Sequence, residues 1–411
     1  MHWIIAVAVM LQDETKQELD QLRKRVEELE RKAGQTQPEA PPDRDRGEVY
    51  SKPFLARIGD VVRLGGYIDL EYISVQDSNN DTFDQHRLVP FIYADISKHI
   101  KVATEIEIEH GNGTELGVEF AHIDYFFTDA IGLRAGIVLD PLGKFNLVHD
   151  APFQDLTLRP LVCESILGTV LREPGAGFFG ELEAGTWEID YEIYVVNGFK
   201  GLSKAGVTVI DRTNGLRSAR PHGNQLGTSR SRDFNDNKAV VARISASPFL
   251  GLEWGLSAHT GKYDERGNNT LTVYAVDLTL NVGSIIPGEL ASAFEIVGEW
   301  ARADIGRDSL AMAAGVPDDF DGWYVELRFH FMPESWRKAI PGAGEDATFT
   351  LVYRYDALDL DGAERSAHTF GVNFRPREDT VFKFEYQLRG ENGTLSEIDN
   401  DAFVASVATY F

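Results

Sequence analysis

The sequence predicts an all-β transmembrane fold: a sixteen-stranded antiparallel β-barrel preceded by a short α-helical coiled coil. Three observations carry this prediction. Segments of about ten residues, in which apolar and polar side chains alternate, recur throughout the chain from residue 61 onward. No apolar run approaches the roughly 20 residues that a membrane-spanning helix needs. The connections between the segments are long and short in turn, as in a barrel that crosses a membrane.

The composition limits the classes of function before any motif is considered. The chain has 411 residues and a formal net charge of −25, which argues against nucleic acid as a partner because phosphate binding needs a basic surface. Cys163 is the single cysteine, which excludes an internal disulfide and a cysteine-rich metal site. A chain this long exceeds one ordinary soluble domain but suits one large barrel.

Residues 1–12 contain an apolar run from Trp3 to Leu11 that is similar to the hydrophobic region of a secretory signal. The stretch 6–8, Ala-Val-Ala, has the small residues of a cleavage site, although no lysine or arginine precedes the run. We interpret residues 1–12 as the remnant of an export signal and leave its cleavage position open.

Residues 13–33 predict a short amphipathic helix of heptad spacing, with charged side chains between the apolar positions. The heptad core positions are Leu19, Leu22, Val26 and Leu29. A helix of this length, about 30 Å, is marginal alone, so we expect it to act in oligomerisation as a coiled coil. A solvated single helix is the alternative. Residues 34–60 form a Pro-rich, charged linker to the barrel.

The barrel domain is expected over residues 61–411. Within its first segment, for example, Leu70 faces away from Asp69 and Glu71. Repetition of such two-faced segments is typical of a barrel with lipid outside and water inside. The predicted strands are residues 61–75, 86–97, 99–110, 117–127, 131–139, 177–185, 187–197, 238–247, 250–259, 270–282, 290–302, 321–331, 347–356, 365–375, 379–389 and 401–411.

The connections give an independent test of the barrel. If both termini lie in the periplasm, connections after odd strands face outside and are long, and those after even strands are short turns. The long ones include residues 140–176, 198–237 and 303–320. The short ones include residues 97–99, 128–131, 247–251 and 375–379, and only 283–289 and 332–346 depart from the rule. In a soluble β-protein, the competing fold, long and short connections would not alternate between odd and even strands.

Two stretches resemble the phosphate-selective porin O/P family. In residues 123–162 a strand-turn-strand ends in Gly-Ile-Val-Leu-Asp-Pro-Leu-Gly at 136–143, and a loop stretch follows at 153–159. Residues 174–201 are similar to the family's next hairpin. The resemblance extends over most of the predicted barrel. It implies a homotrimeric outer-membrane porin whose third external loop, residues 140–176, folds into the lumen.

The resemblance and the strand facing give two sets of candidate pore residues. The expected constriction loop carries Lys144, Asp150, Asp155, Arg159, Glu164 and Arg172. The polar faces expected to line the pore carry Asp69, Glu71, Lys101, Glu105, Glu107, Glu109, Arg134, Glu181, Glu183, Glu188, Asp190 and Glu192. Phosphate selectivity needs a row of basic side chains, whereas here the acidic ones prevail. We therefore expect a general or cation-preferring pore; the alternatives are an anion- or phosphate-selective pore and carboxylates that are solvated without a role in selectivity.

The expected function is a water-filled channel for passive diffusion of small hydrophilic solutes and ions across the outer membrane of a Gram-negative-type envelope. No enzyme motif occurs, so we expect no catalysis. The alternative is a structural barrel that ties the outer membrane to peptidoglycan or another cell-wall polymer through the periplasmic coil at residues 13–33. Deleting residues 13–48 would distinguish the two, because a tether variant would lose envelope integrity and keep solute uptake.

Three further features concern the C-terminal strand and the connections of the barrel. The chain ends in a strand with alternating apolar residues and the terminal Phe411, which is similar to the signal that outer-membrane assembly machinery reads. The basic connection 198–237 could contact lipopolysaccharide phosphates, with a solvated loop as the alternative. Asp77, Asn79 and Asp81 in an external loop are weak Ca²⁺ candidates against a solvated turn, and no other metal site is expected.

Overall fold

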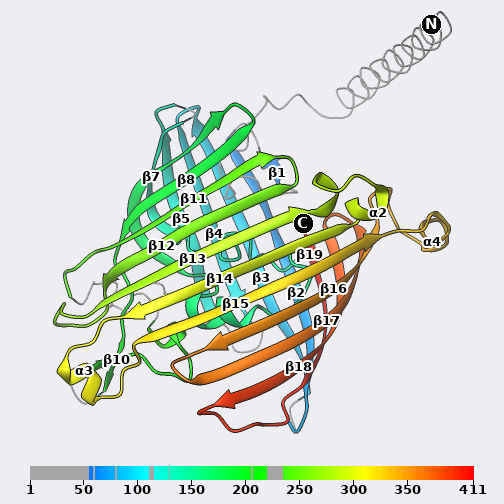
Figure 1. Cartoon of the computed structure of the whole chain (residues 1–411). Coiled ribbons are helices and arrows are strands. Elements are labelled where there is room, and N and C mark those ends of the chain that lie inside the picture. Colours follow the sequence, from blue (N-terminus) through cyan, green and yellow to red (C-terminus); the bar gives the residue numbers. More distant parts are fainter. Residues whose placement is uncertain are drawn as a thin grey trace, which may run out of the picture. The chain divides into compact units, whose positions relative to one another are not determined.

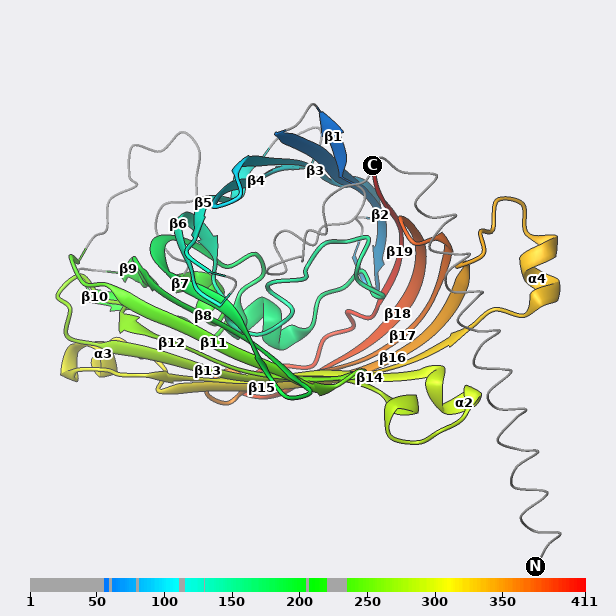
Figure 2. The same ribbon diagram turned by 90° about the horizontal axis from the view of Figure 1, so that it is seen from above.

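The computed structural model describes residues 55–58, 61–78, 81–110, 115–128, 130–204, 207–219 and 235–411. In these residues, sixteen long antiparallel strands close into one barrel (Figures 1 and 2). The ring closes where the last strand pairs with the first, from Ala402 opposite Val75 to Tyr410 opposite Tyr67. The predicted fold class and strand number are confirmed.

The strands occupy the predicted segments. They are β2 (Val62–Val75), β3 (Thr82–Ser97), β4 (Ile100–Glu109), β5 (Glu115–Phe126), β6 (Gly132–Leu139), β7 (Arg172–Ala184), β8 (Trp187–Val196), β11 (Ala239–Phe249), β12 (Leu252–Lys262), β13 (Thr270–Asn281), β14 (Phe294–Ile305), β15 (Asp319–Phe331), β16 (Thr348–Asp359), β17 (Ala363–Arg377), β18 (Thr380–Gly393) and β19 (Ala402–Tyr410). β7 begins at Arg172 rather than at 177, because Pro174 and Gly175 hide the start of a strand from a pattern search.

The barrel exposes apolar side chains on its outer face and encloses polar ones, which is the reverse of a soluble barrel. On β2 the side chains of Ile68 and Leu70 are each 40% exposed on the outer face, whereas Asp69 between them is 1% exposed on the inner face. The same arrangement recurs on β8, where Ile193 and Val195 lie outside. Apolar side chains in contact with the surroundings and polar ones enclosed are the arrangement that a lipid bilayer requires.

The connections follow the predicted parity. Long connections at 140–171, 197–238 and 306–318 separate β6 from β7, β8 from β11 and β14 from β15. They contain the small elements β9 (Leu202–Lys204), β10 (Val207–Val209), η1 (Cys163–Leu167), η2 (Leu216–Ala219) and α3 (Ser309–Ala313).

The two departures from the parity rule are short helical insertions at the end of the barrel that carries the tight turns (Figure 1). One holds η3 (Val282–Ser284) and α2 (Glu289–Ser292), and the other holds α4 (Glu334–Ala339). They expose Ile285, Leu290 and Trp336. Exposed apolar and aromatic side chains at a barrel rim fit the boundary between lipid and water, so these insertions lengthen the connections without crossing the rim.

Phe411 takes part in the closing seam. Its amide donates to the Gly66 carbonyl at 2.9 Å, and the Gly66 amide donates to the Phe411 carbonyl at 3.1 Å. A Cβ atom at Gly66 would lie 2.8 Å from the Phe411 ring. Gly66 is therefore needed for the terminal ring to approach β2. The short β1 (Ala56–Ile58) continues the pairing along β2.

The predicted signal remnant, the coiled coil with Leu19, Leu22, Val26 and Leu29, and most of the linker lie outside the described residues. Within the described residues no helix has the length and apolar character to cross a membrane.

Candidate functional site

The long connection 140–171 runs through the inside of the ring instead of over its rim, as the view from above shows (Figure 2). We call residues 140–171 the internal segment. Its one helical turn, η1, has four side chains that are buried, and Val162 before it is also buried. Their partners on the inner wall are small or aromatic side chains such as Ala301, Ala303 and Tyr324. This apolar patch fixes the middle of the internal segment against β13 to β15.

Cys163 lies in this patch with 0% exposure. Burial raises the pKa of the Cys163 thiol well above its ordinary value. We predict that a maleimide reagent labels Cys163 in the folded barrel at least about a hundredfold more slowly than in the denatured chain, because the thiolate is the reactive form and the site is closed. Mass spectrometry of timed samples measures this ratio. Fast labelling of the folded protein would show that the internal segment leaves the wall.

Carboxylates on two parts of the barrel wall hold the internal segment through its backbone. The two carboxylate oxygens of Glu385 on β18 accept hydrogen bonds from the amides of Thr157 at 2.8 Å and Leu158 at 2.7 Å. Glu299 on β14 accepts one from the amide of Phe145 at 2.6 Å. These inward carboxylates are thus anchors for a loop that would otherwise leave buried amides without partners.

Basic side chains complete the attachment. Lys383 on β18 donates to the carbonyl of Ala151 at 2.7 Å. Asp155 of the segment forms ion pairs with Arg328 at 3.2 Å and with Arg375 at 3.1 Å. Burial alone would raise the pKa of Asp155, but the two guanidinium groups outweigh it and hold the pKa below the ordinary value. Asp155 therefore stays ionised as a cross-lumen anchor.

The other residues predicted for the constriction have separate surroundings. Lys144 contacts Glu253 on β12 at 2.6 Å and the Thr279 hydroxyl at 3.2 Å. Asp150 accepts a hydrogen bond from the Tyr410 hydroxyl at 3.0 Å. Glu164 lies half-buried in η1.

Arg159 and Arg172, the last two predicted constriction residues, lie in different elements. Arg159 of the internal segment borders a narrow hollow between that segment and the wall. Arg172 belongs to β7 rather than to the loop, and its guanidinium lies 3.7 Å from the Glu107 carboxylate. Sequence pattern alone placed Arg172 in the loop because the start of β7 was not recognisable.

Arg134 is the centre of an inward-facing network. Its guanidinium contacts both oxygens of Asp124, the shortest distance being 2.9 Å, and reaches Glu192 at 3.4 Å. It also donates to the Tyr194 hydroxyl at 3.2 Å and lies over the Phe179 ring. With exposures of 4% for Arg134 and 0% for Asp124, the charges compensate each other rather than face the water.

We predict that Arg134→Leu destabilises the barrel by about 3–5 kcal/mol, because it leaves the buried Asp124 carboxylate without a counter-charge. Thermal unfolding in detergent, followed by circular dichroism and by the shift in gel mobility on heating, measures the loss. The double variant Arg134→Leu with Asp124→Asn serves as the control and should recover a large part of it. Equal losses for both variants would show that packing, not charge pairing, is what Arg134 provides.

Arg87 on β3 is a charged residue of the inner wall that the sequence patterns did not reveal. It lies 3.0 Å from Glu107 and 3.3 Å from Glu109, two predicted pore residues on β4. The inward face of β3 continues with the apolar Val89 and Phe91, both buried. Both faces of β3 are therefore apolar over much of its length, and alternation cannot tell which one faces the lumen.

Two more predicted pore residues also have partners. Glu105 accepts a hydrogen bond from the Tyr93 hydroxyl at 3.2 Å. The Lys101 ammonium lies over the Phe126 ring, 5.7 Å from its centroid. Counting acidic side chains in the sequence thus overstates the charge that a solute would meet.

The hairpin of β7 and β8 differs from the rest of the wall. At its turn end, Glu181 lies directly opposite Asp190, and Glu183 lies directly opposite Glu188. We call these four residues the acidic hairpin. Like charges opposite each other across a strand pair are destabilising. Glu183, Glu188 and Asp190 are exposed, so the acidic hairpin presents a concentrated negative charge to solvent at this end of the lumen.

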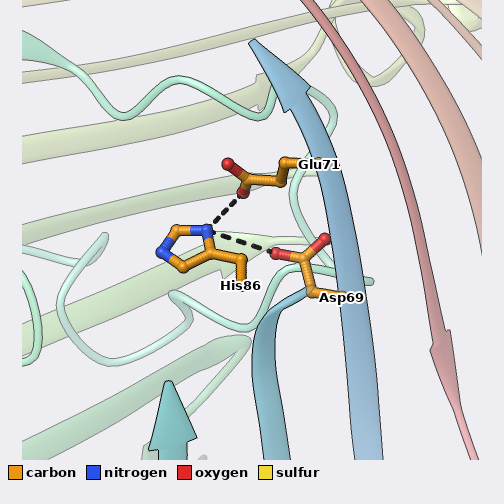
Figure 3. Close-up of side chains that lie close together, drawn as sticks. All are labelled: Asp69, Glu71 and His86. Carbon is orange, nitrogen blue, oxygen red and sulfur yellow. Dashed lines mark ion pairs between the residues drawn. The ribbon is translucent and has the colours of Figure 1, made fainter. Parts of the chain in front are cut away.

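The hollow beside the internal segment is lined by charged side chains of both signs. The wall contributes Asp69, Glu71, Arg87 and Lys383, and the internal segment contributes Arg159. Asp69 and Glu71 were predicted to line the pore from their place on β2. Close to them lies His86 of β3, whose Nδ1 atom is 2.6 Å from a Glu71 carboxylate oxygen (Figure 3).

The fold brings together acidic residues that are distant in sequence at the end with the long connections. Asp318, Asp319 and Asp361 offer oxygens within 4.8 Å of one another. Each also has an arginine partner, namely Arg307, Arg302 and Arg212 in that order. These arginines supply the counter-charge that a cation would. The predicted Ca²⁺ candidates Asp77 and Asp81 belong to no such group among the described residues, and Asn79 lies outside them.

Comparison with solved structures supports the fold. An anion-selective porin from Comamonas acidovorans superposes with a TM-score of 0.54 and 11% identity, over 85% of this chain and 99% of that one. The outer-membrane channel DcaP of Acinetobacter baumannii gives 0.52 and 12%, over 85% and 97%. The trimer form of OmpT, an outer-membrane protein of Vibrio cholerae, gives 0.52 and 9%, over 85% and 99%. The barrel fold is therefore that of the outer-membrane porins.

Sequence comparison adds one relative. An uncharacterized protein of Aquifex aeolicus (strain VF5) is 25% identical over 394 residues, which cover 89% of this chain and 83% of that protein. No protein-family model matches the sequence.

Proposed function

We propose that this protein is an outer-membrane porin: a water-filled channel through which small hydrophilic solutes and ions diffuse passively. The observation that carries the proposal is the inverted barrel with a polar lumen, narrowed by an internal segment that charged groups hold in place. A wall of this kind offers water-like contacts to a solute, and the internal segment limits its size. The polar groups serve attachment and passage, and we propose no catalysis.

We further propose a general or cation-preferring selectivity. The acidic hairpin presents its carboxylates to solvent at one mouth of the lumen. A mouth with a high density of negative charge raises the local concentration of cations and lowers that of anions. The predicted pore residues Glu181, Glu183, Glu188 and Asp190 would therefore act as an entry filter.

An anion-selective or phosphate-selective pore, as in the O/P family that the sequence resembles, is the second candidate. It is favoured by one observation, the basic side chains of Arg87, Arg159 and Lys383 around the hollow. Arg87 is already paired with two carboxylates, and Lys383 with a backbone carbonyl. Because these positive charges are already partly compensated, we give more weight to the negative charge of the acidic hairpin.

For assembly we propose a homotrimer in the outer membrane, with lipid and lipopolysaccharide around it and the N-terminal coil in the periplasm. The Vibrio cholerae neighbour in its trimer form supports the trimer. Phe411, seated at the seam against Gly66, would serve as the assembly signal. Tethering to cell-wall polymer by residues 13–33 and Ca²⁺ binding at the external loops are secondary proposals that rest on the sequence alone.

The reversal potential across a planar bilayer that holds the purified full-length protein under a KCl gradient tests the proposed function. Stepwise conductance with a reversal potential of the cation-selective sign is the expected result. Anion selectivity would overturn the cation preference and favour the phosphate-selective alternative. A correctly folded barrel without any conductance would overturn the channel and favour the tethering role.

A further inference from the structure

We propose that Asp69, Glu71 and His86 form a binding site for a divalent first-row transition metal of the Zn²⁺ class on the inner wall of the barrel. The three side chains converge from β2 and β3, as Figure 3 shows. Their potential ligand atoms all lie within 4.8 Å of one another. His86 Nδ1 is 2.6 Å from a Glu71 oxygen and 3.8 Å from an Asp69 oxygen.

A break in strand register brings His86 into the lumen. Asp69 pairs with Arg87, but Glu71, two residues later, pairs with Asp84, so β3 has one extra residue at this point. Without the bulge, His86 would face away from its inward-facing neighbour Arg87. Bulges of this kind re-aim a side chain. The bulge thus converts a pair of wall carboxylates into a group of three ligands.

Asp69 supplies the independent sign of a missing ligand. Its side chain is 1% exposed, and neither of its oxygens has a hydrogen-bond partner among the residues that the structure describes. A buried carboxylate without hydrogen bonds is costly. One of these oxygens lies 3.8 Å from His86 Nδ1, where a cation between the two groups would satisfy it. Metal bonds of about 2.0–2.2 Å place neighbouring ligand atoms roughly 3–4 Å apart. The distance from His86 Nδ1 to Asp69 is in this range, whereas the contact with Glu71 is shorter and would have to open slightly to admit an ion.

The surrounding charges permit a cation. The acidic groups around the site are Asp69, Glu71, Glu107 and Glu109, and the cationic ones are Arg87, Lys383 and Arg159. His86 Nε2 lies 3.8 Å from Glu109. The ring of His110, whose Nδ1 contacts Asp84 at 2.7 Å, stacks on His86 with a centroid distance of 5.6 Å. Asp84 and Arg172, the partner of Glu107, also belong to these surroundings, so five carboxylates against four cations leave a net negative site.

The ligand set selects the class of ion. One imidazole with two carboxylates suits Zn²⁺ and its neighbours in the first transition row, whereas Ca²⁺ and Mg²⁺ prefer oxygen ligands only. Asp69 and Glu71 border the hollow beside the internal segment, and the His86 side chain is 22% exposed, so solvent reaches the group. Occupancy does not depend on the proposed function, although a bound ion would narrow a conducting pore.

Isothermal titration of the purified, chelator-treated full-length barrel with ZnCl₂ tests the site, with cobalt absorbance as a second readout. We expect saturable binding that weakens at least about tenfold in His86→Ala and in Asp69→Asn. His99→Ala is the matched control, because His99 is an exposed histidine in a turn and should leave binding unchanged. CaCl₂ should bind much more weakly.

A second buried trio, Asp140, Glu173 and His259, makes the test sharper. Loss of zinc binding in His259→Gln but not in His86→Ala would overturn the proposal, as would equal binding by all variants or none by the wild type. Thermal unfolding establishes that each variant is folded. Zinc binding by a barrel that carries no current would refute the proposed channel and support the metal site. Failure of the channel function and failure of the metal site can therefore be told apart.

Discussion

Replacing both Glu385 and Glu299 by alanine is expected to raise the single-channel conductance several-fold and to make the open current noisy. The two carboxylates accept three backbone amides of the internal segment, from Phe145, Thr157 and Leu158. Hydrogen bonds to charged groups contribute roughly 1.5–3 kcal/mol each. Their loss frees both arms of the segment around its apolar centre, and a segment that leaves the lumen widens the narrowest part.

Single-channel recording in planar bilayers measures this change. The matched control is Glu188→Gln. Glu188 is an inward carboxylate of the acidic hairpin on β8, and within the described residues it forms no hydrogen bond or ion pair with the internal segment. It should change the reversal potential and leave the conductance level nearly unaltered. Accelerated maleimide labelling of Cys163 in the alanine variant would confirm that the segment has moved. An unchanged conductance in a folded variant would mean that the apolar patch around η1, together with Lys383 and the ion pairs of Asp155, is enough to hold the segment.

Neutralising the acidic hairpin is expected to reduce the ratio of cation to anion permeability at least about threefold. Removing about half a kT of surface potential lowers the local concentration of monovalent cations and raises that of anions, which changes their ratio by about this factor. The variant combines Glu181→Gln, Glu183→Gln, Glu188→Gln and Asp190→Asn. The same change should raise the thermal stability slightly, because two pairs of like charges opposite each other, costing roughly 0.2–1 kcal/mol each, disappear. Lower selectivity with higher stability would assign these residues to passage rather than to folding.

Reversal potentials under a KCl gradient and thermal unfolding in detergent provide the two readouts. Glu345→Gln with Asp346→Asn is the control, since both residues are exposed on the connection between β15 and β16 at the same end of the barrel. This control should leave the reversal potential unchanged. If it lowered selectivity as much as the hairpin variant, total charge rather than the lumenal position would be responsible. An unaltered permeability ratio in the hairpin variant would refute its role as an entry filter.

Alternation along the chain places the strands and, except on β3, the side of each strand that faces the lumen. Alternation of the kind seen at Ile68, Asp69 and Leu70 repeats because each strand separates lipid from water, and that boundary is visible one strand at a time. Loop parity followed for the same reason, since long and short connections lie on opposite sides of one membrane. The start of β7 was lost only where proline and glycine removed the local signal.

What the inward side chains do follows from strand pairing and ring closure, which local patterns do not contain. Glu385 and Glu299 have the sequence signature of pore carboxylates, but they hold a loop more than a hundred residues away. His86 faces the lumen because of a bulge, which depends on register between two strands. Which side chains meet across the lumen depends on how the ring closes, and no local sequence pattern contains that information. The side of a strand that faces the lumen is set within that strand, whereas the role of a lumenal side chain depends on its partner on another element.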